Sequence, residues 1–447
     1  MDSPTSAQSS MAKTTFESLP IELRMQILLN APDLDSLRSI VLSSPSYHQA
    51  YRLVRKDALE NILHNQYAGL VEISEAIAAV RSKAFHAGRP SDRYNIYALL
   101  DARRRSEEIR RLGKLSATEQ PFPDRPTDTN EVIDLLQLHR IAVSLLDDYS
   151  RNVPCPEWMD PSKWRTEILP LSFSQIEKQR YFRAFYRLQT HCNLFGATEH
   201  PVYSLGHRKT PDWDKEFSDE EAWQIFFGTL SPWEVEEFSC LWQHFHDRLG
   251  ELYHEIANDL NQYGPKPIQV LPEHLRAPSS CSVVDCDNLK LHDIEVRQAL
   301  ASIGPSFLLK LLQEKEYIAR RNLVLANGAP YFPCFPDFSP HNYGVDLPFL
   351  YPADRFNFGS DLSGFQTLLA TLPEIERPNL AWQKAWLSDL EPSEPIFEEM
   401  LVTGVQSRDY SWGYAIWDSE RLIKWGAPLG PIPYRPISTE SRLGSIS

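Results

Sequence analysis

Residues 19–48 read LPIELRMQILLNAPDLDSLRSIVLSSPSYH, and this stretch decides the fold of the N-terminal part of the chain. It contains three helix starts, at Pro20, Asp33 and Pro45. Proline is favoured at the first position of a helix, where the N–H groups have no partner in any case, and Asp or Ser side chains cap such ends. The sequence therefore predicts three short helices over residues 19–66.

Each of these helices carries an apolar stripe. The stripes are Leu19, Leu23 and Ile27 in the first helix, Leu34, Leu37 and Val41 in the second, and Tyr47, Tyr51, Val54 and Ala58 in the third. Positions three or four residues apart lie on the same side of a helix. A segment of about fifty residues cannot bury this much apolar surface within itself. Some of it must therefore meet another surface.

The same stretch resembles the F-box, in the form common in filamentous-fungal F-box proteins. The resemblance rests on Leu19-Pro20-x-Glu22-Leu23, on Ile27-Leu28, on the Asp-Leu-x-Ser-Leu run that starts at Asp33, and on the Leu-Ser-Ser-Pro that ends at Pro45. It covers about 50 of the 447 residues. It implies a three-helix F-box domain, with the rest of the chain free for a second role.

The resemblance also implies a partner. An F-box docks on the Skp-type adaptor of an SCF ubiquitin ligase, and through that adaptor on the cullin. By motif position, Leu19 and Pro20 would lie at the centre of the adaptor contact. Five further residues would supply either adaptor contact or internal packing of the box: Leu23, Ile27, Leu34, Leu37 and Leu42.

The implied function is that of a non-catalytic substrate receptor, in which the C-terminal part of the chain binds an unknown protein substrate for ubiquitin-dependent degradation. Such a receptor acts by proximity, because it raises the local concentration of the charged conjugating enzyme around a substrate lysine. Two alternatives remain. The chain could be an F-box scaffold or interaction protein outside a ligase, or residues 131–430 could contain an unrecognised enzyme.

The charge distribution divides the chain. Residues 1–113 carry fifteen Lys and Arg against thirteen Asp and Glu, which leaves thirty against forty-seven for the remainder. This shift coincides with Pro121, Pro123 and Pro126, so we place a linker there. The predicted organisation is a disordered lead at 1–14, an F-box at 15–66, a helical extension at 67–113, a linker at 114–130, a helical substrate- or partner-binding domain at 131–430, and a flexible tail at 431–447.

The predicted fold class is mainly α: a three-helix F-box followed by an irregular all-helical domain with long loops rich in Pro and aromatic residues. Helical spacing predicts further helices at 70–80, 93–112, 131–149, 175–194, 219–228, 232–262, 291–303, 305–326, 377–389 and 418–425. Ser231 and Glu234 have the spacing of a capping box, and Gly304-Pro305 ends one helix and starts the next. The Pro-laden aromatic stretch from 329 to about 356 is expected to be an ordered loop.

Composition limits the function classes. A net charge of −15 argues against nucleic acid and anionic membranes as partners, because both attract basic surfaces. The chain has no run of eighteen uncharged apolar residues, and its first residues do not have the pattern of a signal peptide. Six dispersed cysteines fit a reducing compartment. We therefore expect an intracellular protein of the cytoplasm, the nucleus or both.

Motifs of catalysis and cofactor binding are absent from the sequence. We find no phosphate-binding loop, no dinucleotide fingerprint and no nucleophile elbow. His274, Cys281, Cys286 and His292 do not have the spacing of a zinc module, and His254-Glu255 lacks the second histidine of a zincin helix. We therefore expect no catalytic residue, no metal and no cofactor.

Several clusters have a structural interpretation. The run Arg103-Arg104-Arg105 is followed by acidic residues, which favours an exposed, salt-bridged helix over a nuclear signal. The neighbouring acidic pairs Asp147-Asp148 and Glu236-Glu237 are expected on solvated helix faces. His244 and His246 are expected to be surface or part-buried, and the spacing of Trp382 and Trp386 favours the core over a partner.

Overall fold

The computed structural model of the protein describes residues 16–112, 125–201, 213–261, 293–328, 347–348, 362–387, 402–403 and 411–428. The described chain is mainly helical, which confirms the predicted fold class. Its only strands are β1 (Leu347–Pro348) and β2 (Val402–Thr403), which pair antiparallel. None of the helices in these ranges combines the length and the apolar character that a membrane crossing requires.

The chain folds as two compact units. Unit 1 comprises Met1–Gly69 and Pro126–His139, and unit 2 comprises Leu70–Arg125 and Arg140–Ser447. The chain therefore passes from one unit to the other at Gly69–Leu70, at Arg125–Pro126, which lies within the predicted linker 114–130, and inside a helix at His139–Arg140. The described residues of the predicted extension 67–113 belong almost entirely to unit 2. The predicted lead 1–14 and tail 431–447 lie outside the described residues.

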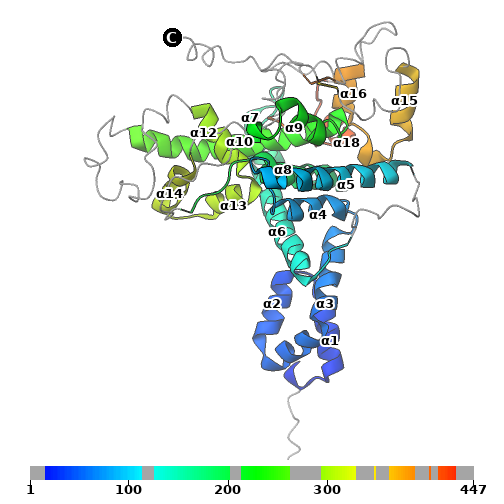
Figure 1. The fold of residues 1–447 in the computed structure, drawn as a ribbon, viewed down its shortest axis with the longest axis vertical. Helices are drawn as coiled ribbons and strands as arrows, with labels where there is room; N and C mark the ends of the chain where they lie inside the picture. Colours follow the sequence, from blue (N-terminus) through cyan, green and yellow to red (C-terminus); the bar gives the residue numbers. More distant parts are fainter. Residues whose placement is uncertain are drawn as a thin grey trace, which may run out of the picture. The chain divides into compact units, whose positions relative to one another are not determined.

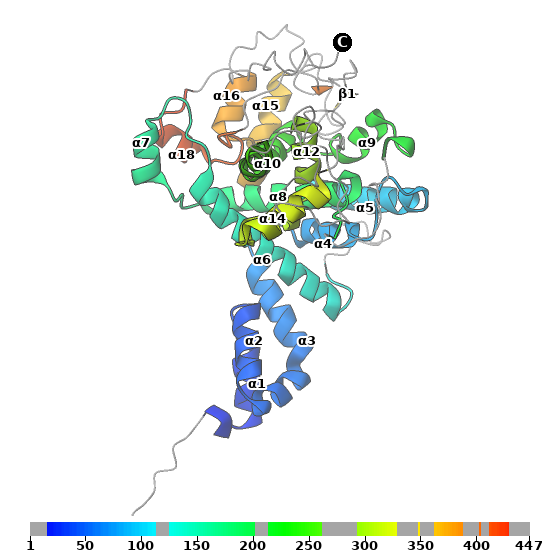
Figure 2. The ribbon, with the colours of Figure 1, turned by 90° about the vertical axis from the view of Figure 1, so that its left-hand side faces the viewer.

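Unit 1 begins with the three expected helices, α1 (Ile21–Leu29), α2 (Leu34–Ser43) and α3 (Pro45–Tyr67). The Asp33 carboxylate accepts the Ser36 N–H at 2.7 Å and so caps α2, while the Ser44 hydroxyl accepts the Ser46 N–H at 3.2 Å at the start of α3. Figures 1 and 2 show α1 and α2 packed along α3. The sequence predicts a short third helix, but this helix runs for 23 residues.

The core of unit 1 lies between these helices. Its buried apolar residues include Leu28, Ala31, Leu37, Tyr47, Ala50, Val54 and Ala58. The far end of α3 packs on the first half of α6 (Thr129–Asn152). There the Tyr67 hydroxyl donates to the Leu135 carbonyl at 3.0 Å, and the rings of Tyr67 and His139 are 4.9 Å apart.

Unit 2 is built from the remaining elements. They are α4 (Ile73–Ser82), η2 (Pro90–Asp92), α5 (Arg93–Leu112), the second half of α6, α7 (Pro161–Lys163), the π-helical η3 (Trp164–Ile168), α8 (Gln175–Phe195), η4 (Trp213–Lys215), α9 (Asp219–Phe226), α10 (Pro232–Asn261), α12 (Asp293–Ser302), α13 (Pro305–Gln313), α14 (Tyr317–Asn327), α15 (Leu362–Thr371), η9 (Glu374–Glu376), α16 (Leu380–Leu387), α18 (Ser419–Lys424) and the two strands.

The centre of unit 2 is α8. Its start carries a full capping box between Ser174 and Glu177, and α4 and α10 both pack against it. Figure 2 shows α7 and α18 on one side of the unit and α5 and α9 on the other. Most side chains of α8 are buried, including three arginines. A helix buried on nearly all sides is expected at the centre of a large helical core.

The structure differs from the predicted helices at one break. The helix expected over 305–326 is two helices, α13 and α14, separated at Glu314-Lys315-Glu316. Each half buries leucines of its own, while Lys315 and Glu316 between them are exposed. The short α7, η3 and α15 were not predicted. The predicted ordered loop from 329 to 356 lies outside the described residues, apart from β1.

Candidate partner-binding surface

The first apolar stripe of unit 1 is open to solvent along much of its length. Pro20 is exposed, Leu23 is 51% exposed, and Leu19 and Ile27 are half-buried. The neighbouring residue Leu28 is fully buried instead. Successive helix positions are about 100° apart, so α1 uses Leu28 to face the core and leaves the stripe at its side.

The second helix divides its leucines between core and surface. Leu37 is 2% exposed and belongs to the core of unit 1, so it is not available to a partner in this conformation. Leu34 is half-buried, and Leu42 is 71% exposed. The expected adaptor set therefore loses Leu37 to internal packing, because this residue faces α3 while Leu42 faces away from the core.

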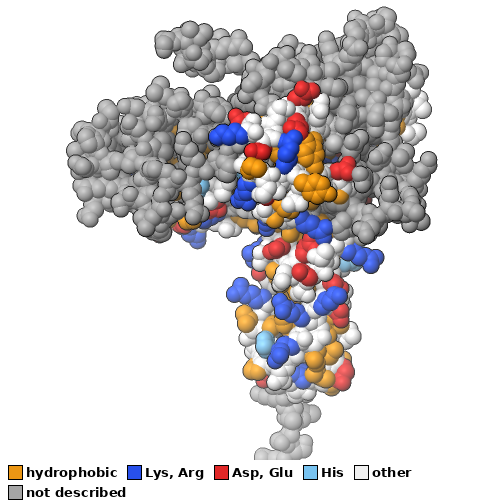
Figure 3. All heavy atoms as spheres, viewed as in Figure 1, with side chains coloured by type: hydrophobic (Ala, Val, Ile, Leu, Met, Phe, Trp, Pro, Cys, Tyr) orange, Lys and Arg blue, Asp and Glu red, His pale blue; other side chains and the backbone are white. Residues whose placement is uncertain are grey.

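Three exposed apolar residues of unit 1 lie outside the predicted set. They are Phe16, Ile21 and Leu53, with exposed fractions of 76%, 37% and 67%. Leu53 directly precedes the buried Val54 and therefore lies off the third stripe. Its exposure could thus have been predicted from the sequence. Figure 3 shows hydrophobic side chains next to basic ones on the visible face of unit 1.

Two polar contacts hold α1 against α3. The guanidinium of Arg24 donates to the Leu19 carbonyl at 3.1 Å and to the Ser46 carbonyl at 2.9 Å. At the other end of α1, the Asn61 side-chain amide donates to the Leu29 carbonyl at 3.2 Å. The open stripe is therefore carried by a helix that is fixed to α3 near both of its ends.

A second feature is a group of buried charges in unit 2, which we call the Arg–Glu network. It consists of Glu75, Arg103, Glu177, Arg180, Arg183, Arg187, Glu234, Glu237 and Arg421. Their side chains are at most 9% exposed, except for Arg421 at 17%. Burying a charge is costly unless an opposite charge and hydrogen bonds compensate it.

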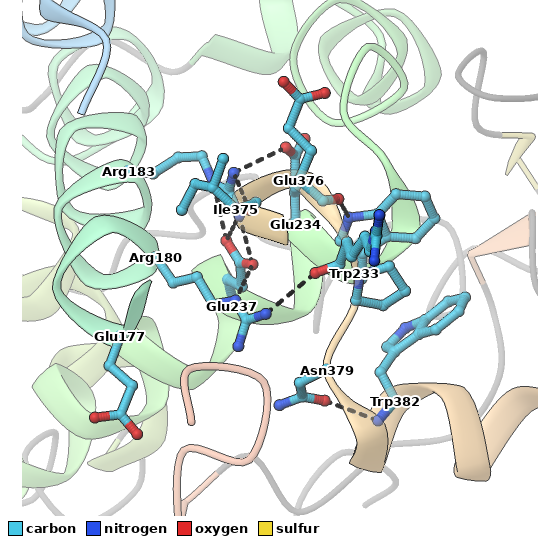
Figure 4. Close-up of polar contacts among 12 residues, drawn as sticks. Glu177, Arg180, Arg183, Trp233, Glu234, Glu237, Ile375, Glu376, Asn379 and Trp382 are labelled. Carbon is cyan, nitrogen blue, oxygen red and sulfur yellow. Dashed lines mark hydrogen bonds and ion pairs between the residues drawn. The ribbon is translucent and has the colours of Figure 1, made fainter. Parts of the chain in front are cut away.

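One short pair of the network joins α8 to α10. Arg183 binds Glu237 in a two-pronged contact, with Nε to Oε2 at 3.0 Å and Nη2 to Oε1 at 2.6 Å, and its third nitrogen donates to the Ile375 carbonyl at 3.1 Å (Figure 4). Arg180 donates to the carbonyls of Trp417 and Arg377. The same row of arginines thus holds α10 and the C-terminal segment.

Arg187 occupies the other end of the row. It contacts Glu75 of α4 at 2.8 Å and Glu234 of α10 at 3.2 Å, and Glu75 also accepts from Arg103 at 3.0 Å. At the start of α8, Glu177 binds Arg421 at 2.5 Å. Each carboxylate of the network therefore lies against at least one guanidinium, an arrangement typical of packing between helices rather than of proton transfer.

The network corrects two predictions. Glu237 is 2% exposed and Glu236 is 7% exposed, so this acidic pair is not on a solvated face. Glu236 accepts a hydrogen bond from the hydroxyl of Tyr414. Arg103 is also buried, at 4% exposure, and pairs with Glu75, so this residue of the arginine run does not lie on an exposed face of its helix. The pairing partners come from distant segments, which a helical spacing does not indicate.

Two other candidate residues, His244 and Trp382, are packed in the core of unit 2. His244 is 2% exposed and lies 3.6 Å from an Asp148 oxygen, and burial lowers its pKa. Trp382 is fully buried, as the core interpretation predicts. No group of three or more His, Cys, Asp or Glu in the described ranges could hold a metal ion. His274, Cys281, Cys286 and His292 lie outside those ranges.

The chain was also compared with known proteins. A scan against protein-family models, a search of curated proteins and a search of solved structures each find no match for this chain.

Proposed function

We propose that this chain is an F-box substrate receptor of an SCF-type ubiquitin ligase. Unit 1 binds the Skp-type adaptor through Leu19, Pro20, Leu23 and Leu42, with Ile27 and Leu34 at the margin. Unit 2 binds a protein substrate. The observation that supports this most is the exposure of apolar side chains at the motif positions of unit 1, next to a core that is already complete without them.

The exposed area is large enough to matter for binding. Fully burying a leucine side chain contributes about 1.5–3 kcal/mol. Leu23 is 51% exposed and Leu42 is 71% exposed, so covering both would contribute roughly 2–4 kcal/mol to association. Apolar anchors of this kind dominate the affinity of many interfaces, while the polar rim sets orientation.

The chain takes no chemical part in this function. The adaptor and cullin bring a charged conjugating enzyme close to the substrate, and the receptor supplies two binding surfaces. The Arg–Glu network fits this role, because it uses its charges to fix α4, α8 and α10 in one arrangement. A rigid scaffold presents a substrate lysine within a limited volume.

The test uses the full-length chain and purified Skp-type adaptor. The double variant Leu23→Asp/Leu42→Asp should lose the adaptor, because each Asp would have to be buried without a partner. Leu53→Asp is the matched control, since Leu53 is equally exposed but lies outside the motif. Adaptor binding by the double variant at wild-type strength would refute the proposed surface, and equal loss in the control would point to unspecific apolar contact.

The same material separates a ligase from a non-ligase scaffold. Wild-type chain, adaptor and cullin should assemble, and proteins that are ubiquitinated in cells with wild-type chain should lose this modification with the double variant. A complex that holds the adaptor but excludes the cullin would instead favour the scaffold alternative.

A further inference from the structure

Arg24 occupies an unusual place at the start of α1. The residue before this helix is Pro20, and its side chain provides no capping hydrogen bond. Many helices fix their entry instead with an apolar contact between the residue before the cap and the fourth helical residue. These positions are Leu19 and Arg24 here, so the contact cannot be purely apolar.

The guanidinium replaces that contact with hydrogen bonds to the backbone. Arg24 donates from Nε to the Leu19 carbonyl at 3.1 Å and from Nη1 to the Ser46 carbonyl at 2.9 Å. Both acceptors are main-chain atoms, so the contact does not consume the side chain of Leu19, which stays half-buried. One side chain thus ties the Leu19–Pro20 turn to the first turn of α3.

We infer that Arg24 is a positioning residue for adaptor binding, which fixes the Leu19–Pro20 turn in the orientation that the adaptor requires. The inference rests on the proposed function. Fixing a contact segment before binding removes the cost of ordering it during association. A planar guanidinium suits this role, because its donors have a fixed geometry and reach two acceptors at once, which an ammonium group does not reproduce.

The experiment compares three variants of the full-length chain. Arg24→Met removes both hydrogen bonds and keeps the aliphatic stem, and Arg24→Lys keeps the charge without the fork. Asn61→Ala is the matched control, because it removes the other polar contact between α1 and α3, at the end of α1 away from Leu19. The affinity for the Skp-type adaptor is measured by calorimetry, and amide hydrogen exchange is measured for residues 19–24 and for α3.

Arg24→Met should bind the adaptor about tenfold more weakly, since hydrogen bonds from a charged group contribute on this scale. Its amides at 19–24 should exchange faster while those of α3 keep their protection. Arg24→Lys should fall between Arg24→Met and wild type, and Asn61→Ala should stay within about twofold of wild type, because its single neutral bond is remote from the turn.

Wild-type affinity of Arg24→Met would overturn the inference. So would faster exchange throughout α3 with unchanged affinity of the folded fraction, because that result is what a merely stabilising role produces. If the wild-type chain itself does not bind the adaptor, the proposed function fails. The exchange measurement then still tests whether Arg24 fixes the Leu19–Pro20 turn. Equal exchange at residues 19–24 in wild type and Arg24→Met would refute this.

Discussion

Arg183→Met should strongly destabilise unit 2. The Arg183 side chain is 9% exposed and its partner Glu237 is 2% exposed. Removing the guanidinium leaves Glu237 with Arg180 as its remaining partner in the network, at 3.7 Å instead of 2.6 Å. Breaking a buried ion pair from one side costs about 3–5 kcal/mol, because a charge remains without compensation. We expect a loss of this size in the free energy of unfolding.

A second substitution separates the charge from the lost packing. In Arg183→Met/Glu237→Gln no buried carboxylate is left uncompensated at this position. The remaining costs are an incompletely bonded amide, about 1–3 kcal/mol, and the loss of the carboxylate 3.7 Å from Arg180, whose hydrogen bonds to the carbonyls of Trp417 and Arg377 remain. The double variant should therefore be more stable than Arg183→Met alone, although it carries one substitution more.

The destabilisation should also depend on pH. Burial raises the pKa of the Glu237 carboxyl, and Arg183 and Arg180 oppose this shift. Without Arg183 the pKa of the carboxyl rises further. A carboxyl whose pKa is raised on folding favours the folded state most below its unfolded pKa, near 4.5, and this contribution is lost as the pH rises. The deficit of Arg183→Met should therefore shrink as the pH falls from 7 towards 4.5.

The assay is urea unfolding followed by tryptophan fluorescence. All eleven tryptophans lie at or beyond residue 158, so the signal reports unit 2 alone. Arg151→Met is the control, since Arg151 and its partner Asp147 are both largely exposed. Its unfolding midpoint should match wild type. A loss below about 1 kcal/mol for Arg183→Met, or a double variant as unstable as the single one, would refute the reasoning.

Three further predictions concern single residues. Leu37→Ala should destabilise unit 1 by about 2–5 kcal/mol while Leu42→Ala stays within about 0.5 kcal/mol, as measured by amide exchange in α3. Burial lowers the pKa of His139 from 6.5 to about 4, so the free energy of unfolding of unit 1 should fall by roughly 3 kcal/mol between pH 6.5 and pH 4. His139→Gln should abolish this fall, and a wild-type stability that does not depend on pH would contradict the prediction. Gly413 has a φ of +72° and a Cβ there would overlap the Tyr149 hydroxyl, so Gly413→Ala should lower the unfolding midpoint of unit 2, and adding Tyr149→Phe should recover part of it.

The helices were predictable because their signals are local. Asp33 caps α2 and Pro45 opens α3 at the expected residues, and Gly304, with a φ of +110°, separates α12 from α13. The box predicted at Ser231 and Glu234 forms only in part, as the Ser231 N–H donates to Glu234 at 3.3 Å while the hydroxyl of Ser231 makes no hydrogen bond. Glu234 instead lies between two arginines of α8.

The sequence indicated which residues belong to the candidate surface as a group, but not which of them are exposed. Leu37 and Leu42 are leucines of one motif, and only the packing of α2 on α3 decides that one is buried and the other exposed. The Arg–Glu network could not be predicted, because its partners lie on different elements, from 28 to 244 residues apart in the sequence. One signal was present in the sequence: Arg180, Arg183 and Arg187 share one face of a helix that is otherwise rich in aromatic residues.

The contacts of α8 with Trp417 and Arg421 constrain the order in which unit 2 folds during translation. During translation, α8 leaves the ribosome more than two hundred residues before the carbonyl and the guanidinium that complete the surroundings of Arg180 and Glu177. Until then these charges stay hydrated, because entering a core without partners is too costly. Unit 2 therefore cannot complete its packing before residues 417–421 have been made, and a chain that is truncated before residue 417 should be a substrate for chaperones and proteases.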